Sequence, residues 1–93
     1  MGFSVKIRNW SKIFKALGSP NRLMILKILS NKGQVSVTAL SEELGISLKN
    51  TSRNLSILLN LDLVEYEGKS DHVYYSLNKD MDKTVSSLLK VIL

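Results

Sequence analysis

The sequence of 93 residues contains no cysteine, one proline and one histidine. Without cysteine the chain can form no disulfide, no thiolate metal site and no redox centre on sulfur. No apolar run approaches the roughly 20 residues of a membrane-spanning helix, and no signal-peptide pattern opens the chain. These absences favour a cytoplasmic protein without a membrane partner.

The residue patterns of catalytic sites are also missing. There is no pair of acids placed for acid–base catalysis and no glycine-rich phosphate loop, since Gly33, Gly45 and Gly68 each lie in a predicted turn. The only histidine, His72, lies in a predicted hairpin without the partners of a metal ligand. We therefore expect no enzymatic activity, no cofactor and no metal.

The first third of the chain has no acidic residue. Residues 1–33 carry seven Lys or Arg side chains and neither Asp nor Glu, and the whole chain has a net charge of +5. A basic surplus concentrated in one segment indicates a polyanionic partner. The alternative is a basic face that is only solvated, and charge by itself does not decide between the two.

The composition is that of one ordered domain. Hydrophobic residues make up 44% of the chain and charged residues 23%, which fits a folded rather than a disordered protein. A chain of this length can bury a small core without disulfides or metal. There are no internal repeats, low-complexity stretches or linkers, so we expect a single domain over residues 1–93.

Residues 38–59 are organised as two short helices joined by a tight turn. Thr38 and Ser47 are predicted N-caps, because a hydroxyl at that position accepts a hydrogen bond from an unpaired amide. Gly45 follows the first helix, where a left-handed residue commonly ends it. Helical spacing places one set of leucines inward: Leu40 and Leu44 in the first helix, and Leu48, Leu55, Leu58 and Leu59 in the second.

The opposite face of the second helix is polar. It carries two i,i+4 pairs of hydrogen-bonding side chains, Lys49 with Arg53 and Asn50 with Asn54. A short amphipathic helix with such an exposed face fits the major groove of DNA. Residues 38–59 thus predict a helix–turn–helix.

The two ends of the chain each carry an apolar seam. Helix 3–17, which Gly18 ends, and helix 79–92, which Asn78 caps, are predicted from apolar residues at spacings of three and four. The side chains of these seams are Phe3, Ile7, Trp10 and Phe14 in the first, and Met81, Val85, Leu88 and Ile92 in the second. Seams at both ends of a small chain favour a symmetric homodimer built from both helices.

Three further elements complete the pattern. Ser19 caps a helix over residues 20–30, with proline at its first position, and this helix is apolar on most sides, as a core helix is. Residues 34–37 alternate as a brief strand, and residues 64–77 form a β-hairpin with a polar tip at residues 68–71. The order α-α-β-α-α-β-β-α is a mostly α fold with a small β-hairpin, a winged helix–turn–helix.

Several stretches now resemble the arsenic-repressor (ArsR-like) family of bacterial and archaeal metal-responsive repressors. FKALGSPNRLMILKIL resembles the family's opening, VTALSEELGISLKNTSRNLSILLNLDLV its recognition unit, and VYYSL its second wing strand. The resemblance runs without gaps from about Phe14 to Leu77. It implies a homodimer that binds operator DNA, with the first and last helices at the interface.

The metal ligands of that family are absent from the matching positions. Ser36, Val37 and Thr38 stand where the family has Cys-Val-Cys, and hydroxyls are poor ligands for soft ions. The second family site uses Asp and His on the terminal helix, where this chain keeps Asp80 and Asp82 but has no histidine. The resemblance therefore predicts DNA binding without the usual metal sensing, and it leaves the effector open.

Two smaller departures concern the DNA-binding unit. Asn54 stands where the family commonly has histidine, and an Asn amide can still pair bidentately with adenine. Asp62 stands where the family has glycine after the recognition helix, and Asp is one of the few side chains that tolerate a left-handed backbone. Neither departure argues against DNA binding.

We predict a sequence-specific transcriptional regulator, most simply a repressor, that binds double-stranded DNA as a homodimer. The predicted DNA-binding residues are Ser47, Lys49, Asn50, Ser52, Arg53 and Asn54 of the helix–turn–helix, Lys69 at the wing tip and Arg22 at the start of the core helix. The alternative is a winged-helix protein–protein interaction module that no longer binds DNA. Acids surround Lys69 in the wing, and Leu48 could contact a protein partner instead of the core or a thymine methyl group.

Overall fold

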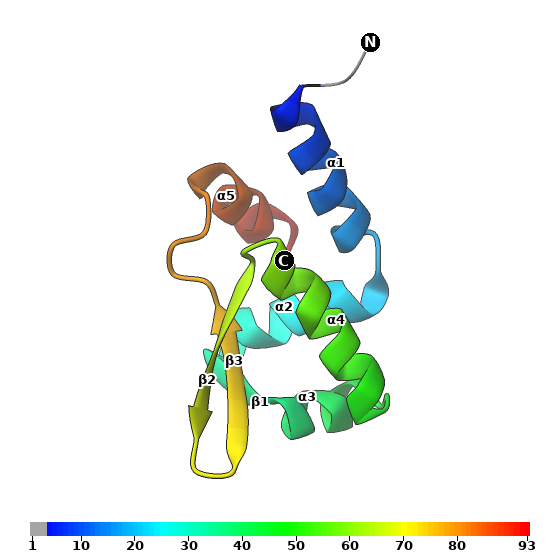
Figure 1. Ribbon diagram of the computed structural model, residues 1–93, viewed down its shortest axis with the longest axis vertical. Coiled ribbons are helices and arrows are strands. Elements are labelled where there is room, and N and C mark those ends of the chain that lie inside the picture. Colours follow the sequence, from blue (N-terminus) through cyan, green and yellow to red (C-terminus); the bar gives the residue numbers. More distant parts are fainter. Residues whose placement is uncertain (1–3) are drawn as a thin grey trace.

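Five helices and three strands follow one another in the predicted order α-α-β-α-α-β-β-α (Figure 1). The computed structural model describes residues 4–93. The elements are α1 Val5–Leu17, α2 Pro20–Lys32, β1 Gln34–Ser36, α3 Val37–Leu44, α4 Leu48–Asn60, β2 Val64–Lys69, β3 His72–Leu77 and α5 Lys83–Ile92. The winged helix–turn–helix fold is confirmed.

The three strands form one antiparallel sheet in the order β1-β3-β2. Val35, Tyr75 and Tyr66 lie opposite one another across it. Six residues of β2 pair with β3, but only three of β1 do, so the outer half of the hairpin extends beyond β1 as a wing (Figure 1). Ser70 adopts φ 54° in the two-residue turn at its tip.

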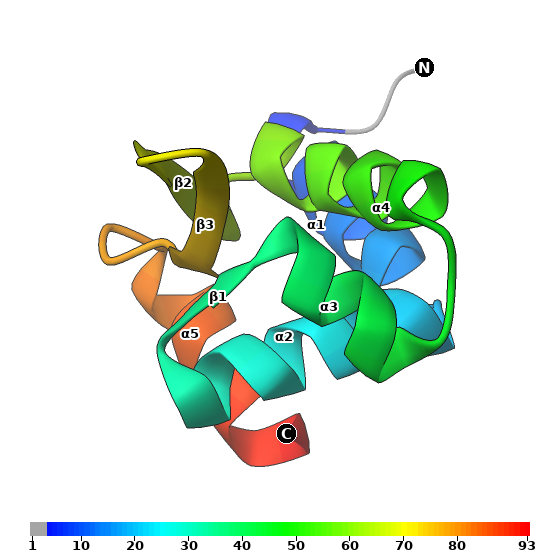
Figure 2. The same cartoon turned by 90° about the horizontal axis from the view of Figure 1, so that it is seen from below.

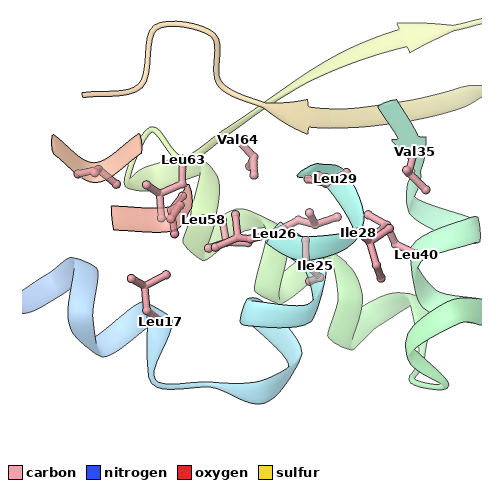
Figure 3. Packing of buried hydrophobic residues seen from close by; sticks show 13 residues of the cluster. Leu17, Ile25, Leu26, Ile28, Leu29, Val35, Leu40, Leu58, Leu63 and Val64 are labelled. Atoms are coloured by element: carbon pink, nitrogen blue, oxygen red, sulfur yellow. The ribbon is translucent and has the colours of Figure 1, made fainter. Parts of the chain in front are cut away.

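The core is centred on α2. Ile25, Leu26 and Leu29 are almost fully buried, and side chains from every other element except β3 complete the cluster (Figure 3). The outer face of α2 is exposed, with Met24 at 48%. In α1 only the C-terminal end is fully buried, at Ala16 and Leu17, while Trp10 and Ile13 pack against the core partly buried.

Three helices begin later or are capped differently than predicted. α1 begins at Val5 after the cap Ser4 rather than at residue 3, and Phe3 lies outside the described residues. Ser36, not Thr38, caps α3, since its Oγ accepts from the amide of Ala39 at 3.1 Å. Both shifts leave the helix–turn–helix in place.

The last helix begins at Lys83, four residues after the predicted start. Asp82 is its cap and accepts from the amides of Thr84 and Val85. Asn78, the predicted cap, instead donates from Nδ2 to the carbonyl oxygen of Asp62 at 3.0 Å. This bond holds the loop before α5 against the end of α4.

The molecule is elongated, with extents of 47 × 23 × 23 Å. α1 projects from the body, and α5 lies at the same end of the molecule (Figure 1). Seen from below, α4 runs along the upper side of the molecule, with α1 behind it, α3 and then α2 below it in the picture, and the wing beside it (Figure 2). Within residues 4–93, no helix has both the length and the apolar character needed to cross a membrane.

Candidate nucleic-acid interface

The turn between α3 and α4 is built as the sequence predicts. Gly45 adopts the left-handed conformation at φ 68°, and its amide donates to the carbonyl oxygen of Ser41 at 2.9 Å. Ser47 then caps α4, because its Oγ accepts from the amide of Asn50 at 3.0 Å. With both helix ends satisfied by hydrogen bonds, the angle between α3 and α4 is fixed locally.

One face of α4 is buried in the core and the opposite face is exposed. Leu55 and Leu58 are fully buried. The predicted contact residues Lys49, Asn50, Ser52 and Arg53 are all exposed. The structure thus holds these four side chains outward on a helix that is anchored from behind.

Leu48 differs from its predicted inward place. It is 52% exposed, and Thr51 occupies the buried position in the first turn of α4. Thr51 can be buried because its hydroxyl donates to the carbonyl oxygen of Ser47 at 2.9 Å. Leu48 therefore presents an apolar side chain at the exposed start of the recognition helix.

Arg22 and Asn54, both predicted to face DNA, are bonded to each other. Arg22 Nη1 donates to Asn54 Oδ1 at 2.9 Å, and Arg22 Nε donates to the carbonyl oxygen of Ala16 at 2.7 Å. Asn54 Nδ2 donates to the carbonyl oxygen of Asn50 at 3.0 Å. The structure brings these two residues together. Both the oxygen and the nitrogen of the Asn54 side-chain amide form hydrogen bonds within the protein.

Lys69 is held on the wing rather than extended from its tip. Its Nζ donates to Gln34 Oε1 at 2.9 Å and lies 5.9 Å from the ring centroid of Tyr74. Gln34 Nε2 in turn donates to Glu67 Oε2 at 3.5 Å. Gln34 was not among the predicted site residues. Its contact with Lys69 depends on β1 and β2 both pairing with β3, so only the strand order could have indicated it.

Two tyrosines of the wing lie against each other. The rings of Tyr66 and Tyr75 lie 5.6 Å apart on neighbouring strands. Burial, and secondarily the neighbouring Tyr66, raise the pKa of the Tyr75 hydroxyl above its ordinary value. Tyr75 is therefore a neutral packing residue at the pH of a cell.

Two of the positions matching the family's metal ligands are engaged in helix capping. Ser36 caps α3 and Asp82 caps α5. His72 begins β3 and contacts the ring of Tyr74 edge-on at 6.1 Å. Within residues 4–93, no three side chains of the metal-binding types are grouped around one point.

The predicted dimer residues fall into three groups. Ile7, Phe14 and Ile92 are exposed, with Phe14 at 57%. Trp10, Met81 and Leu88 are partly buried against the core of the same chain. Val85 is only 3% exposed and belongs to that core, so it has almost no surface left for a partner. The sequence seams did not include two further exposed apolar side chains, Val5 and Val91.

The fold and the site define a winged helix–turn–helix protein of the DNA-binding class. The defining features are a helix pair joined by a tight turn, an outward polar face on the second helix and a flanking wing. Residues 19–66 match the family described as "Bacterial regulatory protein, arsR family". The chain belongs to this family of transcriptional regulators, as the resemblance predicted.

Two relatives support this assignment. The chain is 35% identical over 83 residues to the arsenical resistance operon repressor of Bacillus subtilis, covering 89% of this chain and 76% of the relative. It is 31% identical over 87 residues to the uncharacterized HTH-type transcriptional regulator MJ1325 of Methanocaldococcus jannaschii, covering 94% of each. The family and both relatives are transcriptional regulators, not enzymes.

Solved structures share the fold over nearly the whole chain. The homodimeric winged helix–turn–helix DNA-binding domain of Mb0332 from Mycobacterium bovis, residues 1–100, matches with a TM-score of 0.79 and 27% identity. That match covers 99% of this chain and 85% of the other. Reduced HlyU from Vibrio cholerae matches with a TM-score of 0.80 and 25% identity, covering 94% and 87%.

Proposed function

We propose that the protein is a sequence-specific DNA-binding repressor that acts as a homodimer. The observation that carries the proposal is the outward face of α4, where Lys49, Asn50 and Arg53 are exposed while the opposite face is anchored in the core. Guanidinium and amide groups can bond base edges bidentately in the major groove. Repression is inferred from the relative named as an arsenical resistance operon repressor.

The residues of this surface take different roles in the proposal. Lys49, Asn50 and Arg53 contact base edges, and Ser47 and Ser52 contact phosphates that position the helix. Asn54 and Arg22 hold α4 in place, since their hydrogen bonds run to each other and to the backbone. Lys69 contributes a weaker backbone contact from the wing, because Glu67 lies within the same hydrogen-bonded group.

A dimer of this chain would use α1 and α5. Ile7 and Phe14 on α1 and Ile92 on α5 are exposed apolar side chains, and Val5 and Val91 extend the same two helices. The homodimeric domain from Mycobacterium bovis supports such an assembly. A symmetric dimer presents two copies of α4, and half-sites on DNA are then spaced by about one helical turn, or about 34 Å.

Regulation by soft metal ions is not part of the proposal. The hydroxyl of Ser36 accepts a capping hydrogen bond from the amide of Ala39, and hydroxyls are poor ligands for soft ions. A DNA-binding measurement with and without Zn²⁺ or arsenite tests this point, and an ion-dependent loss of DNA binding would contradict it.

Selection of bound duplexes from a random pool tests the main proposal. We expect enrichment of two related half-sites, bound by a species whose mass by light scattering equals two chains. Retention of binding by the Arg53→Ala variant with unchanged base preference would contradict the role of α4. The absence of any preferred sequence at low salt would contradict sequence-specific binding altogether.

The second candidate is a protein–protein interaction module that no longer binds DNA. The exposed Leu48 at the start of α4 favours it, since an apolar side chain on a recognition face suits a protein groove as well as a thymine methyl group. The Leu48→Gln variant separates the two candidates. A DNA-binding protein would keep its affinity for duplex DNA, whereas an interaction module would lose its protein partner.

A further inference from the structure

Three basic side chains of α1 lie on one stripe of the helix. Arg8, Lys12 and Lys15 follow one another at spacings of four and three, which brings them to one face. All three are exposed. This basic stripe is distinct from the exposed apolar side chains Ile7 and Phe14, which lie about 100° away on the same helix.

The basic stripe borders on the recognition helix. Lys12, Lys15 and Arg22 line a hollow of about 290 Å³ together with Ile57 and Asn60 of α4. None of the described residues that line this hollow is acidic. The hollow therefore places the positive charges of α1 and α2 directly beside α4.

The hollow continues the exposed face of α4. Lys49, Arg53 and Ile57 lie at successive spacings of four, so Ile57 is one turn beyond Arg53 on the same side. From Lys49 to Ile57 the helix rises about 12 Å. A basic track thus runs from Lys49 past Arg53 to the hollow and on along α1 to Arg8.

Within the described part of the chain, the charges of this track form no ion pair with an acidic residue. Across residues 4–93, the one ion pair within 4 Å joins Lys32 to Glu43 at 2.9 Å, and neither residue belongs to the track. Unpaired cations that continue the face of a recognition helix complement the phosphate backbone of DNA, which carries one charge per about 1.7 Å of duplex.

We propose that Arg8, Lys12 and Lys15 contact the phosphate backbone between the two half-sites. The inference rests on the proposed function, because α1 also carries the proposed dimer face at Ile7 and Phe14. In a symmetric dimer both copies of α1 then lie near the two-fold axis, between the two recognition helices. Such contacts strengthen binding and fix the spacing of half-sites without reading sequence.

The salt dependence of DNA binding tests the proposal. A variant with Arg8→Gln, Lys12→Gln and Lys15→Gln is compared with a matched variant carrying Lys27→Gln, Lys32→Gln and Lys79→Gln, which removes three exposed charges outside α1, α4 and α5. Both are measured on the selected duplex, with mass by light scattering. The slope of log K against log salt should fall by about 0.9 for each phosphate that the stripe variant no longer neutralises, up to about 5 for a dimer. The matched variant should keep the slope of the unmodified protein.

Neutral methylphosphonate linkages locate the contacts on the DNA. Placed between the half-sites, they should weaken binding of the unmodified protein and leave the stripe variant unaffected. Placed outside the half-sites, they should affect both proteins equally. Equal losses for both proteins with the central substitution, or an unchanged salt slope for the stripe variant, would overturn the proposal.

Two other results are informative and are distinguishable. In the first, octanoate, a small organic anion, is added to both proteins and the amide resonances around the hollow are followed. If octanoate shifts these resonances only in the unmodified protein, and the DNA salt slope of the stripe variant is unchanged, the hollow is a small-anion site and the proposed backbone contact is wrong. Failure of the unmodified protein to bind any duplex at low salt would overturn the proposed function itself.

Discussion

Arg22 donates a hydrogen bond of 2.9 Å from Nη1 to Oδ1 of Asn54, and one of 2.7 Å from Nε to the carbonyl oxygen of Ala16. One planar side chain on α2 thereby joins the end of α1 to the recognition helix. The rigid fork of a guanidinium can satisfy both acceptors at once, which a lysine cannot do. The proposed dimer face and the proposed DNA-reading face are thus linked through Arg22.

Replacement of Arg22 by Gln should lower the free energy of unfolding by about 1–3 kcal/mol, since hydrogen bonds from a part-buried charged group are lost. Asn54→Ala should remove part of the same stabilisation. The double variant should therefore be less destabilised than the sum of the two, with a coupling of at least about 0.5 kcal/mol. Urea unfolding of the four proteins measures this coupling.

The matched control for this cycle is Arg53→Gln, because Arg53 is exposed on α4. Its stability should stay within about 0.5 kcal/mol of the unmodified protein. Strict additivity of Arg22→Gln and Asn54→Ala would mean that the hydrogen bond between them contributes nothing to folding.

Arg53→Ala should weaken binding to the selected duplex by about 1–3 kcal/mol and relax the preference at one base-pair position in each half-site. The physical reason is the loss of a bidentate donor from the exposed face of α4. Lys27→Ala removes an exposed charge from α2, away from the helix–turn–helix, and should leave the base preference unchanged. Competition with duplexes substituted at single positions supplies the measurement.

The element order could be predicted because the signals that define it are local. The apolar spacing of α4, the alternation in the wing and the glycine after α3 each act within one or two turns of chain. Gly45 is left-handed, as its place after α3 predicts. Asp62 is also left-handed, at φ 59°, which agrees with its standing where the family has glycine.

The details of the site depend on contacts between distant residues, which leave no local signal. Arg22 and Asn54 are 32 positions apart, and nothing in either segment indicates that they bond each other. Asn78 was predicted to cap the last helix, but its side-chain amide donates to the carbonyl oxygen of Asp62. Asp82 is the cap instead. Sequence periodicity also cannot tell an apolar side chain that faces its own core, such as Val85, from one that is exposed, such as Ile92.

The cap of α3 gives a direct test of one such difference. Ser36→Ala should lower the free energy of unfolding by about 1 kcal/mol, because the amide of Ala39 loses its acceptor. Thr38→Ala is the matched control and should change stability by less than about 0.5 kcal/mol, since Thr38 is exposed inside the first turn. A larger loss for Thr38→Ala than for Ser36→Ala, measured by urea unfolding, would restore the cap that the sequence suggested.

Phe14 offers the sharpest test of the proposed dimer. Its ring lies 5.7 Å from that of Trp10 and is 57% exposed, so a charged side chain there should be tolerated by the isolated chain. Phe14→Glu should therefore yield a folded monomer by light scattering, because a carboxylate would be buried without a partner in the dimer. That monomer should still bind a single half-site while losing the added affinity for two half-sites on one duplex. Met24→Glu, at a residue 48% exposed on the outer face of α2, should leave the dimer intact. If both variants remained dimers, the interface would have to lie on another surface of the protein.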